Sequence, residues 1–85
     1  MKKSLDWRQN ILVTIYEQTN RFGLAVPLRR SIVELDPYNQ KNLLKLGEDL
    51  KAVGNLAGAK AVIPLIDAFA ANTPEAAQAK REFGA

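Results

Sequence analysis

The chain matches itself when it is shifted so that Leu12 falls on Leu46. This repeat shift places apolar residues on apolar residues and alanine on alanine, in the further pairs Tyr16 and Leu50, Phe22 and Leu56, and Ala25 and Ala59. It also places the turn residue Asn20 on Gly54. Periods of about 20–50 residues are typical of proteins in which one supersecondary unit stacks on the next. The sequence therefore predicts two copies of one structural unit.

Apolar residues recur at the spacing of a helix face within each copy, and no segment alternates with period two over a useful length. Asp6, Asn39 and Thr73 are suited to cap helices, and Gly54 is suited to end one. We therefore expect an all-α fold. Its predicted helices cover residues 7–19, 23–35, 40–53, 56–71 and 74–83.

Two of these helices carry more specific expectations. The apolar side of the first carries Ile11, Leu12, Ile15 and Tyr16 at helical spacing. The fourth contains Pro64 well inside it, and proline lacks an amide hydrogen and crowds the carbonyl group four residues earlier. We therefore predict a kink or a break near residues 60–61.

The repeated positions match a known consensus, Trp-x2-Leu-Gly-x2-Tyr followed by Ala-x3-Phe and Pro, whose period is the same as the repeat shift. The second copy fills these places with Leu43, Leu46, Gly47, Leu50, Ala59 and Ile63, and the first with Leu12, Tyr16, Ala25 and Pro37. The chain thus resembles the tetratricopeptide repeat family. The resemblance implies a short α-solenoid of two antiparallel helix hairpins and a C-terminal capping helix. It divides a single domain, residues 1–85, into repeat one (6–39), repeat two (40–73) and the capping helix (74–83).

The first copy departs from the family pattern. Gln9 replaces the leading aromatic residue, Val13 the glycine and Arg29 the late aromatic residue. The segments 26–28 and 63–65, both centred on proline, do not coincide under the repeat shift, because the second lies three positions too late. This mismatch predicts a three-residue insertion early in the fourth helix.

Composition excludes several classes of function. The chain has no histidine and no cysteine, and it has no glycine-rich phosphate loop, so the usual nucleophiles and bases are missing. Glu48 and Asp49 are neighbours on a helix and cannot converge, so we interpret them as a solvated face, and Arg29-Arg30 likewise as surface. We expect no enzymatic activity, no small-molecule substrate, no cofactor and no metal site.

The net charge of +3 is weak and its acidic members are spread along the chain, which argues against a nucleic-acid surface. The longest stretches without a charged side chain, residues 9–16 and 52–59, are too short for a membrane span. Charged residues follow the basic start, so we expect no signal peptide and a cytoplasmic location. A periplasmic location, or attachment to a membrane protein, stays open.

The resemblance implies a protein-binding module, an adaptor or scaffold, in which the first helix of each hairpin lines a groove for a peptide or helix. The groove residues are then Trp7, Asn10, Ile11, Thr14, Lys41, Leu44, Lys45 and Glu48. Lys41 and Lys45 lie on one stripe and would favour an acidic partner, although an ordinary solvated pair is the alternative. Trp7 is interpreted as a core lid or as an anchor for a partner.

Two repeats are fewer than such arrays usually need to bury a continuous core. We therefore expect the chain to form a homo-oligomer or to dock on a larger complex through an end of the array. Two alternatives remain: a soluble tail domain of a larger bacterial protein, such as a membrane glycan polymerase or ligase, and a small helical nucleic-acid-binding protein.

Overall fold

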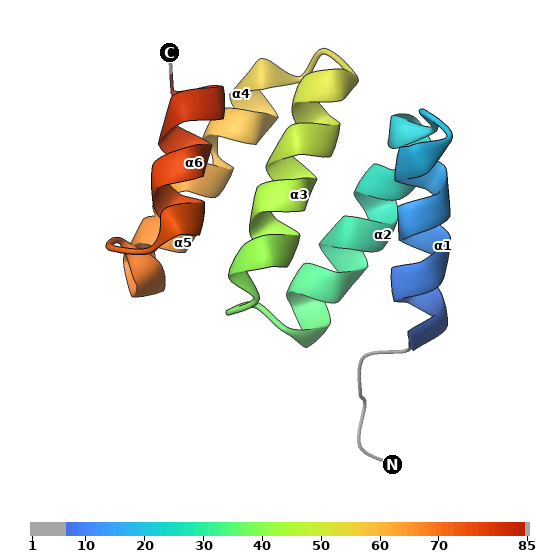
Figure 1. Cartoon of the computed structure of the whole chain (residues 1–85), viewed down its shortest axis with the longest axis horizontal. Helices are drawn as coiled ribbons and strands as arrows, with labels where there is room; N and C mark the ends of the chain where they lie inside the picture. Colours follow the sequence, from blue (N-terminus) through green and yellow to red (C-terminus); the bar gives the residue numbers. More distant parts are fainter. Residues whose placement is uncertain (1–6, 85) are drawn as a thin grey trace.

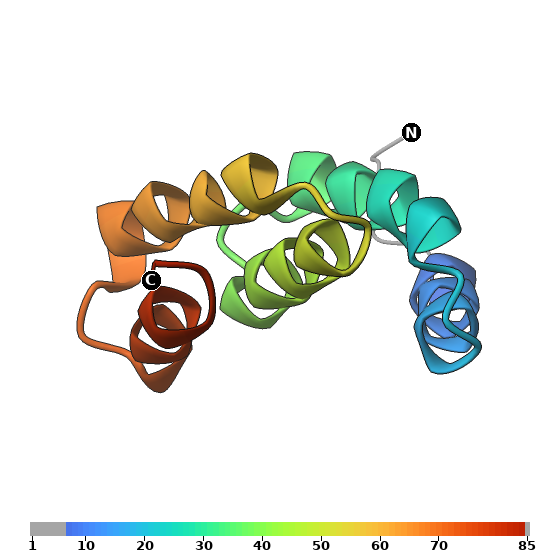
Figure 2. The ribbon, with the colours of Figure 1, turned by 90° about the horizontal axis from the view of Figure 1, so that it is seen from above.

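The computed structural model describes residues 7–84, and these residues are all-α with no strand among them. The helices stand side by side in chain order (Figure 1) and form two layers (Figure 2), with α1, α3 and α6 in one layer and α2, α4 and α5 in the other. Their bounds are α1 Trp7–Gln18, α2 Phe22–Leu35, α3 Gln40–Ala52, α4 Leu56–Lys60, α5 Val62–Ala70 and α6 Pro74–Phe83. The predicted all-α class is confirmed.

The helix ends follow from the capping residues. The Asn39 side chain accepts a hydrogen bond from the Asn42 amide at 3.1 Å, and the Thr73 hydroxyl accepts one from the Ala76 amide at 3.3 Å. Both bonds satisfy amides that a helix leaves without partners in its first turn. Pro74 is the first residue of α6, where its fixed φ suits a helix start. The predicted cap at Asp6 lies outside the described residues.

The predicted break in the fourth helix is present. α4 ends at Lys60 and α5 begins at Val62, with Ala61 between them outside both helices. Lys60 lies four residues before Pro64, so its carbonyl group is the one that would have accepted the missing amide of Pro64. The break therefore has a local cause in one side chain.

The repeat shift of the sequence is visible in the backbone itself. The Arg21 amide donates to the Tyr16 carbonyl at 2.7 Å, and the Asn55 amide donates to the Leu50 carbonyl at 2.8 Å. In the same turns Asn20 and Gly54 have positive φ angles of 61° and 86°. These bonds and angles end a helix in the same way at two places that the repeat shift superimposes.

The predicted three-residue insertion is wrong. After the break, the Thr73 amide donates to the Ala70 carbonyl, and the repeat shift places this bond on the one that the Asn39 amide donates to the Asp36 carbonyl. The same shift therefore holds before the fourth helix and again after it. Pro64 has no counterpart in α2, and it breaks the helix without lengthening the repeat.

The core consists of two apolar clusters of unequal size. The small cluster joins α1 and α2 through Val13, Ala25 and Ile32, with Tyr16 and Leu28 packed against it. The large cluster joins α3 to α6 and receives Val26 and Val33 from α2. Its buried members are Leu43, Leu44, Leu46, Leu50, Ala59, Val62, Ile66, Ala70, Ala76, Ala79 and Phe83.

The apolar side of the first helix is only partly buried. Val13 is fully buried and Tyr16 is half-buried, but Ile11, Leu12 and Ile15 are exposed. α1 is the outermost helix of its layer and packs chiefly on α2 (Figure 2), so a single narrow face of it is covered. The apolar residues on its other sides have no neighbour among the described residues that buries them.

α3 and α6 approach closely at Gly47. A Cβ atom at this position would lie 2.3 Å from Cε2 and 2.6 Å from Cζ of Phe83, whose side chain is buried. A glycine is therefore required for the ring to lie against the α3 backbone.

We expect Gly47→Ala to lower the free energy of unfolding by about 1–3 kcal/mol, because overpacking outweighs the better helix propensity of alanine. Chemical denaturation measures it. Gly23→Ala is the matched control, since a Cβ atom there meets nothing within 4 Å. It should be neutral or slightly stabilising. Adding Phe83→Leu to Gly47→Ala should recover part of the loss, and an unchanged midpoint for Gly47→Ala alone would contradict the packing described.

Candidate interaction surfaces

α3 presents a charged stripe on the side opposite its buried face. Lys41 and Lys45 are exposed and Glu48 is half-buried, at the spacing that places three side chains on one line along a helix. Lys45 Nζ lies 3.4 Å from Glu48 Oε1, so these two residues form an ion pair. The structure therefore brings the two predicted lysines and Glu48 together on one surface.

The other predicted groove residues divide into three groups. Ile11 and Thr14 on α1 are exposed and Asn10 is half-buried, as a lining role requires. Leu44 is buried in the large apolar cluster, so its predicted place in the groove is wrong: it belongs to the core. Trp7 begins α1, but its side chain lies outside the described part of the structure.

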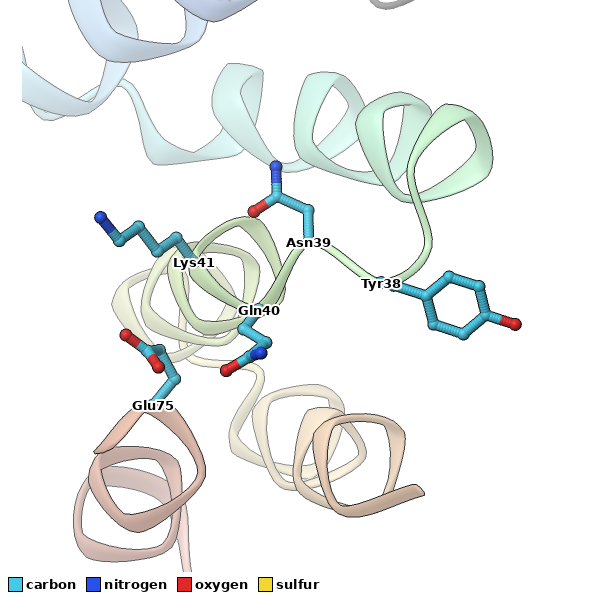
Figure 3. A pocket seen from close by; sticks show the side chains of 5 residues that line it. All are labelled: Tyr38, Asn39, Gln40, Lys41 and Glu75. Carbon is cyan, nitrogen blue, oxygen red and sulfur yellow. The ribbon is translucent and has the colours of Figure 1, made fainter. Parts of the chain in front are cut away.

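A hollow of about 300 Å³ lies beside the first turn of α3 and the first turn of α6. Figure 3 shows Gln40 from α3 close to Glu75 from α6, while the side chains of Lys41 and Tyr38 extend away from them. Lys41 lines this hollow and lies in the first turn of α3, at the positive end of the helix.

A second hollow, of about 450 Å³, lies at the other end of the same two helices. Phe22 and Phe83 contribute apolar surface to it, Glu48 and Glu82 contribute carboxylates, and Lys51 contributes an ammonium group. Burial, and to a smaller degree the neighbouring Glu82, raise the pKa of Glu48, although Lys45 opposes them. The stripe is thus basic near the start of α3 and acidic near its end.

An apolar groove lies over α2, α3 and α5, which sequence reasoning missed. Its volume is about 370 Å³ and no charged side chain lines it. Tyr38 and Phe69 meet edge to face at its rim, with ring centroids 5.2 Å apart. Tyr38 precedes α3 and Phe69 lies near the end of α5, so no local spacing could have predicted their contact.

A buried polar cluster connects the first three helices. Arg29 on α2 donates two hydrogen bonds to the Glu17 carboxylate on α1, from Nη2 at 2.7 Å and from Nε at 2.9 Å. Its Nη1 atom donates to Asn42 Oδ1 on α3 at 3.1 Å, and Asn42 Nδ2 donates to the Arg29 carbonyl oxygen at 3.2 Å. The predicted surface position of Arg29 is therefore wrong, because its guanidinium group is buried and donates three hydrogen bonds.

Asp49 completes this cluster, so its interpretation as a solvated residue is also wrong. It is 2% exposed, and its Oδ2 atom lies 4.0 Å from Arg29 Nε with no hydrogen bond from the described residues. Burial, together with the Glu17 carboxylate, raises the pKa of Asp49 to about 8. Burial also acts on Glu17, but the hydrogen bonds that Arg29 donates to it, together with the neighbouring Asp49, hold the pKa of Glu17 below its usual value.

The charge balance of the cluster follows. At neutral pH it contains one guanidinium, one carboxylate and one protonated carboxyl group, so the buried charges sum to zero. A protonated Asp49 can donate to Glu17, which leaves neither carboxyl group without a partner. The cluster connects α1, α2 and α3 through hydrogen bonds. Because its polar groups have partners, they are tolerated in a buried position.

Within residues 7–84 no helix has the length and apolar content to cross a bilayer, and no three potential ligand side chains come together as a metal site. In comparisons with known proteins, no family model, no curated protein and no solved structure matches this chain. The fold and surfaces define its class: an all-α protein of stacked helices whose turns repeat with the same shift as its sequence.

Proposed function

We propose that this chain is a protein-interaction module of the tetratricopeptide type, an adaptor or scaffold that binds a partner peptide or helix. The observation that carries the proposal is the charged stripe of Lys41, Lys45 and Glu48. It lies on a helix whose other sides are buried by neighbouring helices, so a partner can contact it without disturbing the core.

The charges along α3 give the partner an orientation. Lys41 and Lys45 favour an acidic group near the start of α3, and the positive end of the helix acts in the same sense. Glu48 and Glu82 favour a basic group near its end, where their two carboxylates outnumber the single ammonium group of Lys51. Ile11 and Thr14, exposed on α1, supply the contacts on the opposite side of the proposed groove.

A peptide array that samples acidic and basic residues at varied spacing tests the proposal. We expect peptides with an acidic residue to bind the native protein and to bind Lys41→Glu/Lys45→Glu at least tenfold more weakly. Association should slow more than dissociation accelerates, because surface charges act mainly on encounter. Biolayer interferometry measures both rates.

The matched control is Arg30→Glu/Lys60→Glu. It makes the same change in charge with two exposed residues of the other layer. Equal weakening by both variants would show that net charge alone is responsible. Equal affinity of the native protein and Lys41→Glu/Lys45→Glu for every bound peptide would contradict the proposal.

A further inference from the structure

The outer face of α1 is an apolar surface that nothing in the described structure covers. Ile11 is 50% exposed, Leu12 40% and Ile15 47%. Residues 9–16 contain no charged side chain. Three half-exposed aliphatic residues on one short helix are more than isolated surface hydrophobics.

The internal repeat indicates which part of the molecule the outer face of α1 would pack against. The repeat shift places Leu12 and Ile15 on Leu46 and Asp49, which are 5% and 2% exposed. Asp49 lies beside Arg29 of α2, and Leu46 lies three residues before it on the same side of α3. Leu12 and Ile15 therefore occupy positions that, in the second repeat, pack against the preceding helix.

We infer that a second copy of this chain covers this face, with α1 packed against α1 about a two-fold axis. A head-to-tail contact would need a free face of the kind that α2 offers to α3, but in each copy α3 covers α2 and α6 covers α5. The α1 face is apolar and can pair with itself, and two-fold dimers are the commonest homo-oligomers.

The two α1 helices run antiparallel in this dimer. This arrangement places Ile11 of one copy against Ile15 of the other, because the three apolar residues lie around the middle of a helix that spans Trp7–Gln18. A parallel pair would align the two helix dipoles, whereas the antiparallel pair opposes them.

The dimer is weak. One helix pair of this length buries less surface than the roughly 1,200 Å² at the lower limit of stable complexes. We therefore expect a dissociation constant on the order of 0.1 mM, decreasing at higher salt because each copy carries a charge of +3.

Sedimentation equilibrium of the full chain between about 0.02 and 1 mM tests the inference at concentrations on either side of that constant. The native protein should show a monomer–dimer equilibrium, and Ile15→Glu should raise the dissociation constant at least tenfold. Leu65→Glu is the matched control, since Leu65 is 51% exposed on α5, away from α1. Circular dichroism establishes that both variants are folded.

Cysteine cross-linking tests the orientation, because the chain has no cysteine of its own. Mixing the single variants Ile11→Cys and Ile15→Cys under mild oxidation should give the mixed disulfide in excess over both homodimers. Excess of the two homodimers would contradict the antiparallel arrangement.

A strict monomer up to about 1 mM, or a dimer that Leu65→Glu disrupts and Ile15→Glu does not, would overturn the inference. Ile11 belongs to both proposed surfaces, but Lys41 and Lys45 on α3 belong to the peptide groove alone. Lys41→Glu/Lys45→Glu should therefore weaken peptide binding at least tenfold without raising the dimer dissociation constant, so failure of one proposal is distinguishable from failure of the other.

Discussion

Arg29→Ala should unfold much of the protein at ambient temperature. The change leaves the Glu17 carboxylate and the Asn42 side chain without their buried partner, and breaking a buried ionic group in this way costs about 3–5 kcal/mol. A domain of this size has a total stability of comparable magnitude. Thermal and urea unfolding followed by circular dichroism measure the effect.

The neighbouring arginine supplies the control. Arg30 is exposed, so Arg30→Ala removes the same charge and should change the stability by no more than about 0.5 kcal/mol. A second variant keeps the test informative if Arg29→Ala does not fold. Replacing Glu17, Arg29 and Asp49 together with Leu, Met and Leu removes every charge of the cluster and should restore much of the lost stability. Equal stability of Arg29→Ala and Arg30→Ala would contradict the structural role of Arg29.

Stability should fall as the pH rises from about 5 to about 8. The pKa of Asp49 is about 8 in the folded protein and about 3.9 in an unfolded chain, so the folded state binds more protons throughout this range. Raising the pH then removes a proton from a buried group beside the Glu17 carboxylate. We expect a loss of about 3–4 kcal/mol, measured by urea unfolding at several pH values.

Asp49→Asn is the variant that isolates this effect. An amide can still donate to Glu17 but does not ionise, so the decline between pH 5 and pH 8 should disappear. Below about pH 4 the sign reverses, because the pKa of Glu17 is lowered and its protonation breaks the pair with Arg29. A decline of equal size in Asp49→Asn would assign the effect to another group.

The boundaries and breaks of the helices were predictable because single side chains cause them. Asn39 and Thr73 supply the oxygen atoms that cap helices, and Pro64 removes the hydrogen bond to Lys60. Each of these effects acts within four residues along the chain. The sequence contains all that is needed to predict them.

The rotation of α1 was not predictable, because Ile11, Leu12, Val13 and Ile15 surround the helix on several sides. Helical spacing alone cannot select the side that packs, and the choice depends on α2 being its chief neighbour. The repeat shift was the only indication of the orientation of α1, because it aligns Leu12 and Ile15 with residues that face a preceding helix.

Part of the polar cluster could have been predicted from helical spacing. Arg29 lies four residues after Ala25 and three before Ile32, so it shares the face of two fully buried residues. Asp49 lies three residues after Leu46, again on a buried face. Spacing predicts that both are buried, but it does not predict that Glu17 reaches them from another helix.

Because the two apolar clusters differ in size, the end of the molecule formed by α1 should be less stable to local unfolding than the part formed by α3 to α6. Detaching α1 opens the small cluster of Val13, Ala25 and Ile32 and separates Glu17 from Arg29, while the large cluster from α3 to α6 stays closed. In a stacked array each unit is held only by its neighbours, so disruption begins where neighbours are fewest. The Glu17–Arg29 ion pair therefore helps to hold α1 against α2. Any contact that covers α1 should oppose its detachment, which is the first step of local unfolding at this end of the molecule.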